Sequence, residues 1–311
     1  MLNEDKQLLL ATITPRGTDI TPRQKYYRET IRNQQKELEK LNSFKQNKSK
    51  ERMGDLREYI ADFLKREGID RFGVTKPNPQ FFFRNSTINP TLNALVVFVV
   101  PMKYEEMKDV PSLQSATEIL RAYAKTGEIV VKLTKFLHDL GYDAFGHHPL
   151  GNLNEYHHLL LPPHAAAAGL GEKGRTGLFI DHKYGPMVRL GAVQTNAPLN
   201  FDHPVDKGIN AFCHRCRYCS KYCPPRAIDT TKYIHQLAEG QLVDFKVNGE
   251  KCIRYFEKHF ACGKCLFHCV LAKPSLEEIK KRVDRIETWY YRWVKNGPPE
   301  EWKEIVVPRV S

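Results

Sequence analysis

The chain has 311 residues, enough for one large domain or two of ordinary size. Apolar residues make up 41% and charged residues 27%, as in soluble globular proteins, so neither a disordered nor a membrane-embedded chain is expected. The formal net charge of +12 suits nucleic acid, an acidic lipid surface, an acidic protein partner or a phosphate-bearing ligand, and equally an ordinary solvated surface. The longest apolar run, Ala94 to Met102, is far too short to span a bilayer.

Residues 1–54 are predicted to be a basic helical extension. The stretch from 25 to 52 is rich in Lys, Arg, Gln and Asn, and its apolar stripe is thin. We therefore expect an exposed helix that lies on the surface or contacts a partner chain. The first residues show neither a basic segment followed by an apolar one nor an arginine pair, so we expect a cytoplasmic protein.

Residues 55–200 are predicted to form an α/β core, because strand and helix patterns alternate. Helices are expected at 55–67, at 112–140 with a break near Gly127, and in the small-residue stretch after Pro162 and Pro163. Strands are expected at 71–74, 93–102, 142–146, 177–180 and 188–195. The run at 93–102 is continuously β-branched, which is typical of a strand buried on both faces.

Residues 201–275 hold eight cysteines in two runs, and residues 276–311 are expected to add a C-terminal helix and tail. The first run reads C-x2-C-x2-C-x3-C and is followed by Pro224. The second run reads C-x9-C-x2-C-x3-C. The cysteines are Cys213, Cys216, Cys219 and Cys223, then Cys252, Cys262, Cys265 and Cys269.

The first run is the bacterial ferredoxin pattern, in which three cysteines bind one cluster and the fourth binds the neighbouring cluster. The spacing therefore predicts two [4Fe–4S] clusters in a ferredoxin-like domain. One would be held by Cys213, Cys216, Cys219 and Cys269, and the other by Cys223, Cys252, Cys262 and Cys265. Zinc and disulfides are the alternatives, but zinc sites usually use two separated C-x2-C pairs, and cytoplasmic thiols stay reduced.

Basic residues surround the first cysteine run. They suit the docking of an acidic electron donor, a raised cluster potential, or solvated surface. They are His214, Arg215, Arg217, Lys221 and Arg226.

Four stretches together carry a family resemblance that covers about residues 94–274. They are ALVVFVVPM with the later LGYDAFGHHP, then LPPHAAAAGLGEKGRTGLFIDHKYGPMVRLGAVQTNAPL, FCHRCRYCSKYCPPRAI and KCIRYFEKHFACGKCLFHC. They resemble the superfamily of cobalamin-dependent reductive dehalogenases and epoxyqueuosine reductases. The resemblance implies a nitroreductase-like cobalamin-binding core fused to the two-cluster domain. It also implies base-off cobalamin that is reduced through the clusters.

The chain lacks D-x-H-x-x-G, by which other corrinoid proteins supply a histidine to cobalt, so the corrin would be held by backbone and shape. The glycine-rich turn suits close approach to a large ligand, although it would equally make a tight helix-to-strand turn. The expected corrin-binding residues are His164, Gly169, Gly171, Gly174, Arg175, Gly177 and Arg189.

The resemblance is closer to the dehalogenase branch. Epoxyqueuosine reductases carry an Asp just before this small-residue helix, whereas this chain has Leu160 there and no Asp between Asp143 and Asp181. In dehalogenases a Tyr donates a proton beside a Lys or Arg, because a nearby cation stabilises the phenolate. The resemblance thus makes Tyr123 the candidate acid.

Arg175 and Lys173 are the candidate cations beside that acid. Tyr123 would equally serve as a packing aromatic, and Arg175 would equally bind corrin phosphate or amide groups. Alternative acids lie in the loop before the Pro-Pro pair: Tyr156, His157 and His158.

The expected function is reductive cleavage of a carbon–halogen or similar bond in a small molecule, with reduced ferredoxin or flavodoxin as donor. A tRNA-modifying epoxyqueuosine reductase and a non-catalytic corrinoid or electron-transfer protein are the alternatives. No membrane or nucleic-acid partner is expected, and a homodimer is left open.

Overall fold

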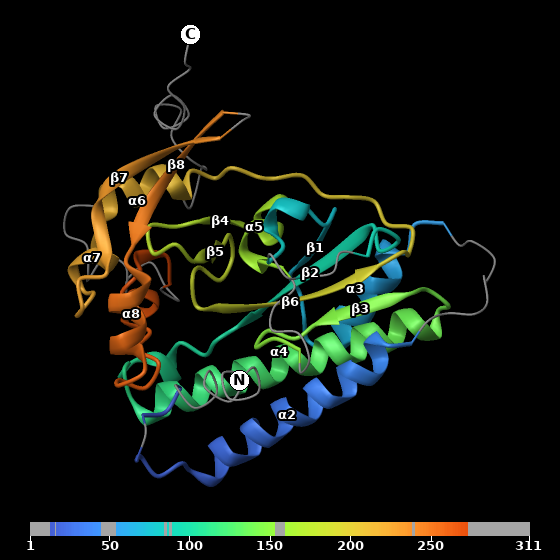
Figure 1. The fold of residues 1–311 in the computed structure, drawn as a ribbon, viewed down its shortest axis with the longest axis horizontal. Helices are drawn as coiled ribbons and strands as arrows, with labels where there is room; N and C mark the ends of the chain where they lie inside the picture. The colour runs from blue at the N-terminus through green and yellow to red at the C-terminus, as the bar shows by residue number, and fades with distance from the viewer. Residues whose placement is uncertain are drawn as a thin grey trace.

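The computed structural model describes residues 13–15, 17–44, 54–83, 86, 89–152, 159–237 and 240–272. At its centre lies a four-stranded sheet of order β1-β2-β6-β3, in which all neighbours are antiparallel (Figure 1). Its strands are β1 (Phe72–Thr75), β2 (Ala94–Pro101), β3 (Ala144–His147) and β6 (Val188–Thr195). Each matches an expected strand to within a few residues, and the mixed α/β architecture agrees with the prediction.

The central strand β2 is buried on both faces, as its β-branched run predicted. Because side chains alternate along a strand, one face of β2 joins one hydrophobic cluster and the other face joins a second. Helix α4 (Leu113–Asp139) covers the first face, and α5 (Leu161–Ala167) with the hairpin of β4 (Gly171–Lys173) and β5 (Phe179–Asp181) covers the second. Helix α3 (Arg57–Arg66) packs at the edge of the first cluster.

Helix α4 runs without interruption through Gly127, so the expected break there was wrong. The glycine has a packing role instead. A Cβ on Gly127 would lie 2.3 Å from Gln34 Oε1 and 2.4 Å from His148 Nε2. The missing side chain therefore lets α2 (Pro22–Asn42) and the 148 loop approach α4 closely.

Helix α2 lies at the surface, as expected, but one of its faces packs against α4 of the same chain. Ile31 and Leu38 are fully buried. Two buried amides replace apolar contacts on the same face: Gln34 Nε2 donates to Ala124 O at 2.8 Å, and Gln35 Nε2 donates to Gly151 O at 2.7 Å. The sequence pattern missed this face because three of its five buried residues are glutamines.

The cysteine-bearing part lies at one end of the sheet (Figure 1). Between the two cysteine runs is a hairpin, β7 with β8, that the sequence analysis did not anticipate. Met107 and Ile119 of the core share a hydrophobic cluster with Leu266 and Phe267, so the cysteine segment is packed onto α4. The elements are α6 (Ile209–Cys216), α7 (Tyr218–Lys221), β7 (Ile228–Leu237), β8 (Gly240–Val247), α8 (Gly249–Phe256) and α9 (Lys264–Phe267).

Short 3-10 turns complete the described elements: η1 (Pro79–Phe81), η2 (Glu105–Met107) and η3 (Val270–Ala272). The expected C-terminal helix and the alternative acids Tyr156, His157 and His158 lie outside the described residues. None of the helices that the structure describes has both the length and the apolar character that a bilayer crossing requires.

Candidate functional site

The first three cysteines of the first run gather with the last cysteine of the second run. All eight cysteines are free thiols. Burial raises the pKa of Cys269 well above its usual range, and the nearby charges of Cys213, Cys216 and Cys219 raise it further. These four, the first group, come from α6, α7 and the segment after α9.

The other four cysteines form a second group. Burial raises the pKa of Cys265, and so do the charges of Cys219 from the first group and of Cys262, Cys252 and Cys223. Burial also raises the pKa of Cys252, and so do the charges of Cys223 and Cys262. Cys223 therefore leaves its own run and lies with the second group.

The chemistry of both groups fits iron–sulfur clusters. Burial raises the pKa of Cys213 to about 12 and that of Cys216 to about 11, so a bound cation is needed to hold these buried sulfurs as thiolates. In the described ranges, no three His, Cys, Asp or Glu side chains converge on a single-ion site. A four-iron cube holds its ligands further apart than one ion does, and it prefers an all-sulfur donor set.

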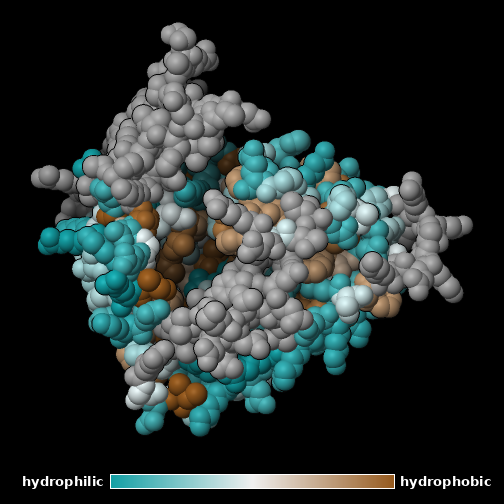
Figure 2. Space-filling model, viewed as in Figure 1, coloured by the Kyte–Doolittle hydropathy of each residue, from teal (hydrophilic) through white to brown (hydrophobic). Residues whose placement is uncertain are grey.

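A cavity of about 380 Å³ lies between α4 and the second group. In Figure 2, hydrophobic residues gather in a hollow on the side where Figure 1 draws α8. The cavity lining includes Tyr123, Thr176, Leu178, Arg189, Ile228, Phe256 and all four cysteines of the second group. A tyrosine, an arginine and the four cysteines of the second group therefore line one space.

The cation beside Tyr123 is Arg189. Its guanidinium carbon lies 4.6 Å from the centre of the Tyr123 ring. Arg189 donates from Nη1 to Val188 O at 3.0 Å, while its buried Nε has no hydrogen-bond partner in the described structure. This pairing was missed, because α4 and β6 are far apart in sequence and only the fold brings the two side chains together.

Neither predicted cation lines the cavity that contains Tyr123. Arg175 lies against the first cysteine group, where it donates from Nε to Cys213 O at 2.9 Å and from Nη1 to Asp229 O at 3.1 Å. Lys173 is exposed on β4. The short hairpin turn between β4 and β5 points Arg175 toward the cysteine loop, which accounts for the difference from the prediction.

Three of the four predicted corrin-contacting glycines are packed against the chain itself. A Cβ would lie 2.6 Å from His203 O at Gly169, 2.1 Å from Ile180 O at Gly171, and 2.3 Å from Ile180 Cδ1 at Gly174. Only Gly177, with φ of +74°, faces open space apart from one methyl group at 3.5 Å. The turn thus has an internal reason for its glycines, and their contact with a corrinoid stays a prediction.

His164 is fully buried, and both of its ring nitrogens are engaged. Nδ1 donates to Leu160 O at 2.6 Å, and Nε2 accepts from the Asn78 N–H at 3.0 Å. Burial lowers the pKa of His164, so the ring is neutral at physiological pH. In this structure His164 joins the start of α5 to the loop after β1, which leaves no nitrogen for a ligand.

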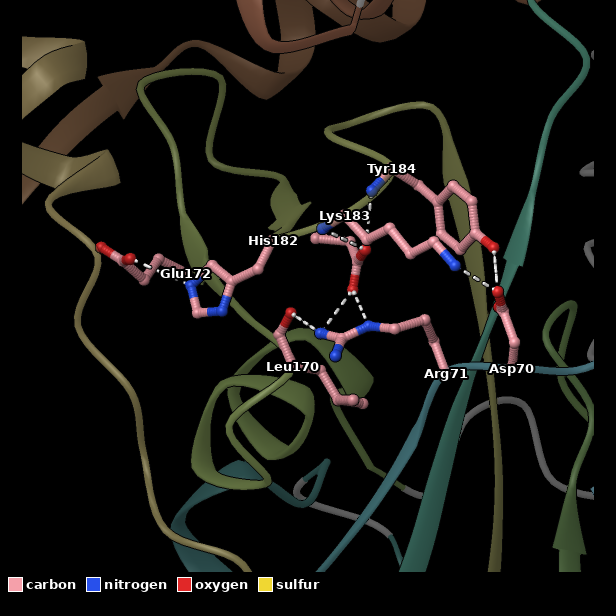
Figure 3. Close-up of polar contacts among 8 residues, drawn as sticks. Asp70, Arg71, Leu170, Glu172, His182, Lys183 and Tyr184 are labelled. Atoms are coloured by element: carbon pink, nitrogen blue, oxygen red, sulfur yellow. Dashed lines mark hydrogen bonds and ion pairs between the residues drawn. The ribbon is translucent and has the colours of Figure 1, made fainter. Parts of the chain in front are cut away.

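A polar network that the sequence analysis did not identify anchors the β4–β5 hairpin to the start of β1 (Figure 3). Arg71 donates to the buried carboxylate of Asp181 at 3.2 Å and to Leu170 O at 2.8 Å. Asp70 accepts from the Tyr184 hydroxyl at 2.6 Å and pairs with Lys183. An Asp directly before a turn was the available signal, since Asp181 also accepts from two backbone N–H groups beyond it.

Glu172 of the same hairpin, which Figure 3 draws beside His182, also contacts the segment that leads into the first cysteine run. Its carboxylate lies 3.1 Å from His182 Nε2 and accepts from the Lys207 N–H at 2.8 Å and the Asn210 N–H at 3.4 Å. Asn210 is in the first turn of α6, where a carboxylate is stabilised by the free amide groups of the helix. The hairpin and the first cysteine group are therefore held in a fixed relation.

No protein-family model matches the chain. A tetrachloroethene reductive dehalogenase from Desulfitobacterium hafniense is 34% identical over 239 residues, which are 74% of this chain and 39% of that protein. Its counterpart from Dehalobacter restrictus is 35% identical over 173 residues, 56% of this chain and 30% of its own length. The chain thus spans less than half the length of these relatives. An epoxyqueuosine reductase from Lactococcus garvieae is 35% identical over only 91 residues, 29% of this chain and 21% of its own.

Solved structures share the fold. A reductive dehalogenase studied for B12-dependent dehalogenation aligns with 85% of this chain and 40% of its own, at 23% identity and a TM-score of 0.69. A catabolic reductive dehalogenase aligns with 73% of this chain and 34% of its own, at 24% identity and a TM-score of 0.62. The chain therefore belongs to the superfamily of reductive dehalogenases and epoxyqueuosine reductases, and it is closer in sequence to the dehalogenase branch.

Proposed function

We propose that this protein is an oxidoreductase that removes halide from a small organohalide. The observation that carries the proposal is the single cavity shared by Tyr123, Arg189 and the second cysteine group. The balanced reaction takes an organohalide, two electrons and one proton to the reduced carbon compound and a halide ion. The cavity supplies a proton donor beside the proposed electron source.

The two cysteine groups would each hold one [4Fe–4S] cluster, and together they would deliver electrons one at a time to the cavity. Cys213, Cys216, Cys219 and Cys269 would bind the first cluster. Cys223, Cys252, Cys262 and Cys265 would bind the second cluster, which borders the cavity. The free thiols, their burial and their grouping support this assignment.

Base-off cobalamin would supply reduced cobalt as the centre at which the carbon–halogen bond is cleaved. Of the residues expected to bind it, Arg189 fits best, since its buried Nε is an unused donor in the wall of the cavity. Gly177 would leave room for a large ligand beside the turn. His164 does not fit as a direct contact, because its two nitrogens are engaged.

Tyr123 would donate the proton, and Arg189 would stabilise the phenolate that remains. The guanidinium lies over the face of the ring, where a cation is attracted to the aromatic system and also lies near the phenol. Arg189 thus takes the role that the sequence analysis gave to Arg175 or Lys173. The apolar lining from Ile119, Leu178 and Phe256 suits an apolar substrate.

A reduced ferredoxin or flavodoxin would supply the electrons. Arg217, Lys221 and Arg226 are exposed close to the cysteine runs, and positive charge there favours an acidic donor. The proposal places the protein in the cytoplasm, where thiolates remain available to iron.

The test is anaerobic reconstitution of the chain with iron, sulfide and cobalamin, followed by incubation with chlorinated and brominated phenols and ethenes under a low-potential reductant. The proposal expects cluster spectra, corrin uptake and halide release that depends on both. Corrin uptake without turnover of any substrate would favour the non-catalytic alternative. Rescue of a queuosine-deficient strain would favour the tRNA-modifying one, and either outcome would overturn the proposal.

A further inference from the structure

Arg175 is a buried cation at the first cysteine group. Its side chain is among the largest fully buried ones in the described structure, at 1% exposure. Two of its donors are taken by the carbonyl oxygens of Cys213 and Asp229. The bond to Cys213 holds the guanidinium against the loop that carries the first cysteine group.

The cysteines of the first group lie close to Arg175. Arg175 lies within electrostatic reach of Cys213, Cys219 and Cys216. Its own backbone N–H also donates toward the Cys213 sulfur. The Cβ position of Gly174 is 3.6 Å from the same sulfur, so the hairpin turn touches the group directly. A cluster held there by four thiolates would bear net negative charge, and it would become more negative on reduction.

The position of the guanidinium is fixed from both sides. At its base the hairpin is anchored by Arg71, which is drawn in Figure 3 and donates to Asp181. At its side, Glu172 accepts from the Asn210 N–H at the start of α6. Because Arg175 lies in the turn between β4 and β5, the anchored hairpin leaves its side chain little freedom to move away from the cysteines. A fixed buried charge acts more strongly than a solvated one, since water screens the latter.

The second cysteine group has a different environment. Lys264, which is partly exposed, stabilises the Cys262 thiolate through its backbone N–H and its charge. Cys252 is exposed, and the cavity lies beside the group. Solvent therefore reaches the second group more readily than the first, where Cys213 and Cys219 are buried.

We propose that Arg175 raises the reduction potential of the cluster held by Cys213, Cys216, Cys219 and Cys269 and leaves the second cluster unaffected. A positive charge fixed beside a cluster stabilises its more negative, reduced form. The inference rests on the proposed clusters, but not on cobalamin, on Tyr123 or on any substrate. Arg175 is thus a tuning residue for electron entry and does not touch the reacting atoms.

The experiment is a potentiometric titration followed by EPR on the reconstituted full chain without cobalamin. It compares the unaltered protein with Arg175→Gln, Arg175→Lys and Lys173→Met. The last variant is the control, because it removes an exposed cation from the same hairpin. Arg175→Gln is expected to shift one cluster to more negative potential and leave the other unchanged. Arg175→Lys is expected to restore most of that potential, and Lys173→Met to cause no shift.

Cys269→Ala identifies the shifted signal, because it removes the first cluster alone. Unchanged potentials in Arg175→Gln would overturn the inference, and so would equal shifts of both clusters. Loss of one cluster's iron in Arg175→Gln and in Arg175→Lys would also overturn it, since Arg175 would then hold the cysteine loop and not set a potential. Failure of the unaltered protein to bind iron would instead reject the proposed function itself.

Discussion

The residues marked as functional by the sequence lie in two regions, the helix-to-strand turn behind the sheet and the cavity beside the cysteines. In the turn, both ring nitrogens of His164 are hydrogen-bonded within the chain, and the backbone of Ile180 fills the space beside Gly171. At the cavity, Tyr123 and Arg189 face open space, and Arg189 keeps an unused donor. Residues that the fold itself satisfies are explained by stability, whereas unsatisfied groups around a cavity require a ligand to explain them.

Alanine variants of the cysteines test the difference between the two regions most directly. Cys269→Ala and Cys213→Ala should each remove the first cluster, and Cys223→Ala and Cys252→Ala should each remove the second. In every case iron should fall from about eight to about four per chain, because alanine leaves one cube without its fourth thiolate ligand. Iron analysis and EPR of the anaerobic protein measure the result.

The informative pair is Cys223 with Cys252, since Cys223 belongs by sequence to the first run. The two alanine variants should keep the same EPR signal, and Cys269→Ala should keep the other one. If Cys223→Ala matched Cys213→Ala, the crossed grouping would be wrong.

The second prediction concerns the cavity side. Tyr123→Phe removes only the hydroxyl, so halide release should fall by about 10²- to 10⁴-fold, the usual contribution of a positioned proton donor. Iron content, cluster potentials and unfolding midpoint should stay as in the unaltered protein. Halide release by an ion-selective electrode measures the effect. An equal rate in the two proteins would show that Tyr123 is a packing residue, like the residues of the turn, and is not the proton donor.

The third prediction concerns the packed side. Gly127→Ala places a methyl group against Gln34 and His148, which are both hydrogen-bonded and buried. The free energy of unfolding should fall by about 1–3 kcal/mol through overpacking, with little change in iron content. Urea denaturation measures it.

Gly249→Ala is the matched control, because nothing lies within 4 Å of its Cβ position. It should change the free energy of unfolding by less than about 0.5 kcal/mol. Equal effects of the two alanines would show that α2 does not pack on α4 as described.

The smallest effect is a pH dependence at His164. Burial lowers its folded-state pKa, so below the ordinary histidine value of about 6.5 the unfolded chain takes up a proton that the folded chain refuses. The stabilisation is complete above that pH and is lost as pH falls toward the folded pKa, by at most about 1.4 kcal/mol per pH unit. Urea unfolding at pH 7.5 and 5.5 should show this loss, and His164→Gln should reduce it. An identical loss in both proteins would contradict a buried, neutral ring.

Much of the fold could be read from sequence because its signals are local. The β-branched run of β2, the glycine after α4 and the cysteine spacing each depend on neighbours along the chain. The role of Gly127 could not be read, since it depends on α2 crossing α4 about ninety residues away in sequence. The same holds for Arg189, whose partner Tyr123 is on another element, and for the anchoring of the β4–β5 hairpin by Asp70 and Arg71.

The central claim is that the second cysteine group, and not the first, borders the reaction cavity. EPR of the cobalamin-loaded protein tests it through the magnetic coupling between paramagnetic cobalt and a reduced cluster. The cobalt signal should be broadened in the unaltered protein and in Cys269→Ala, and it should sharpen in Cys252→Ala. A signal that sharpens in Cys269→Ala instead, or a protein that takes up no cobalamin, would contradict the account.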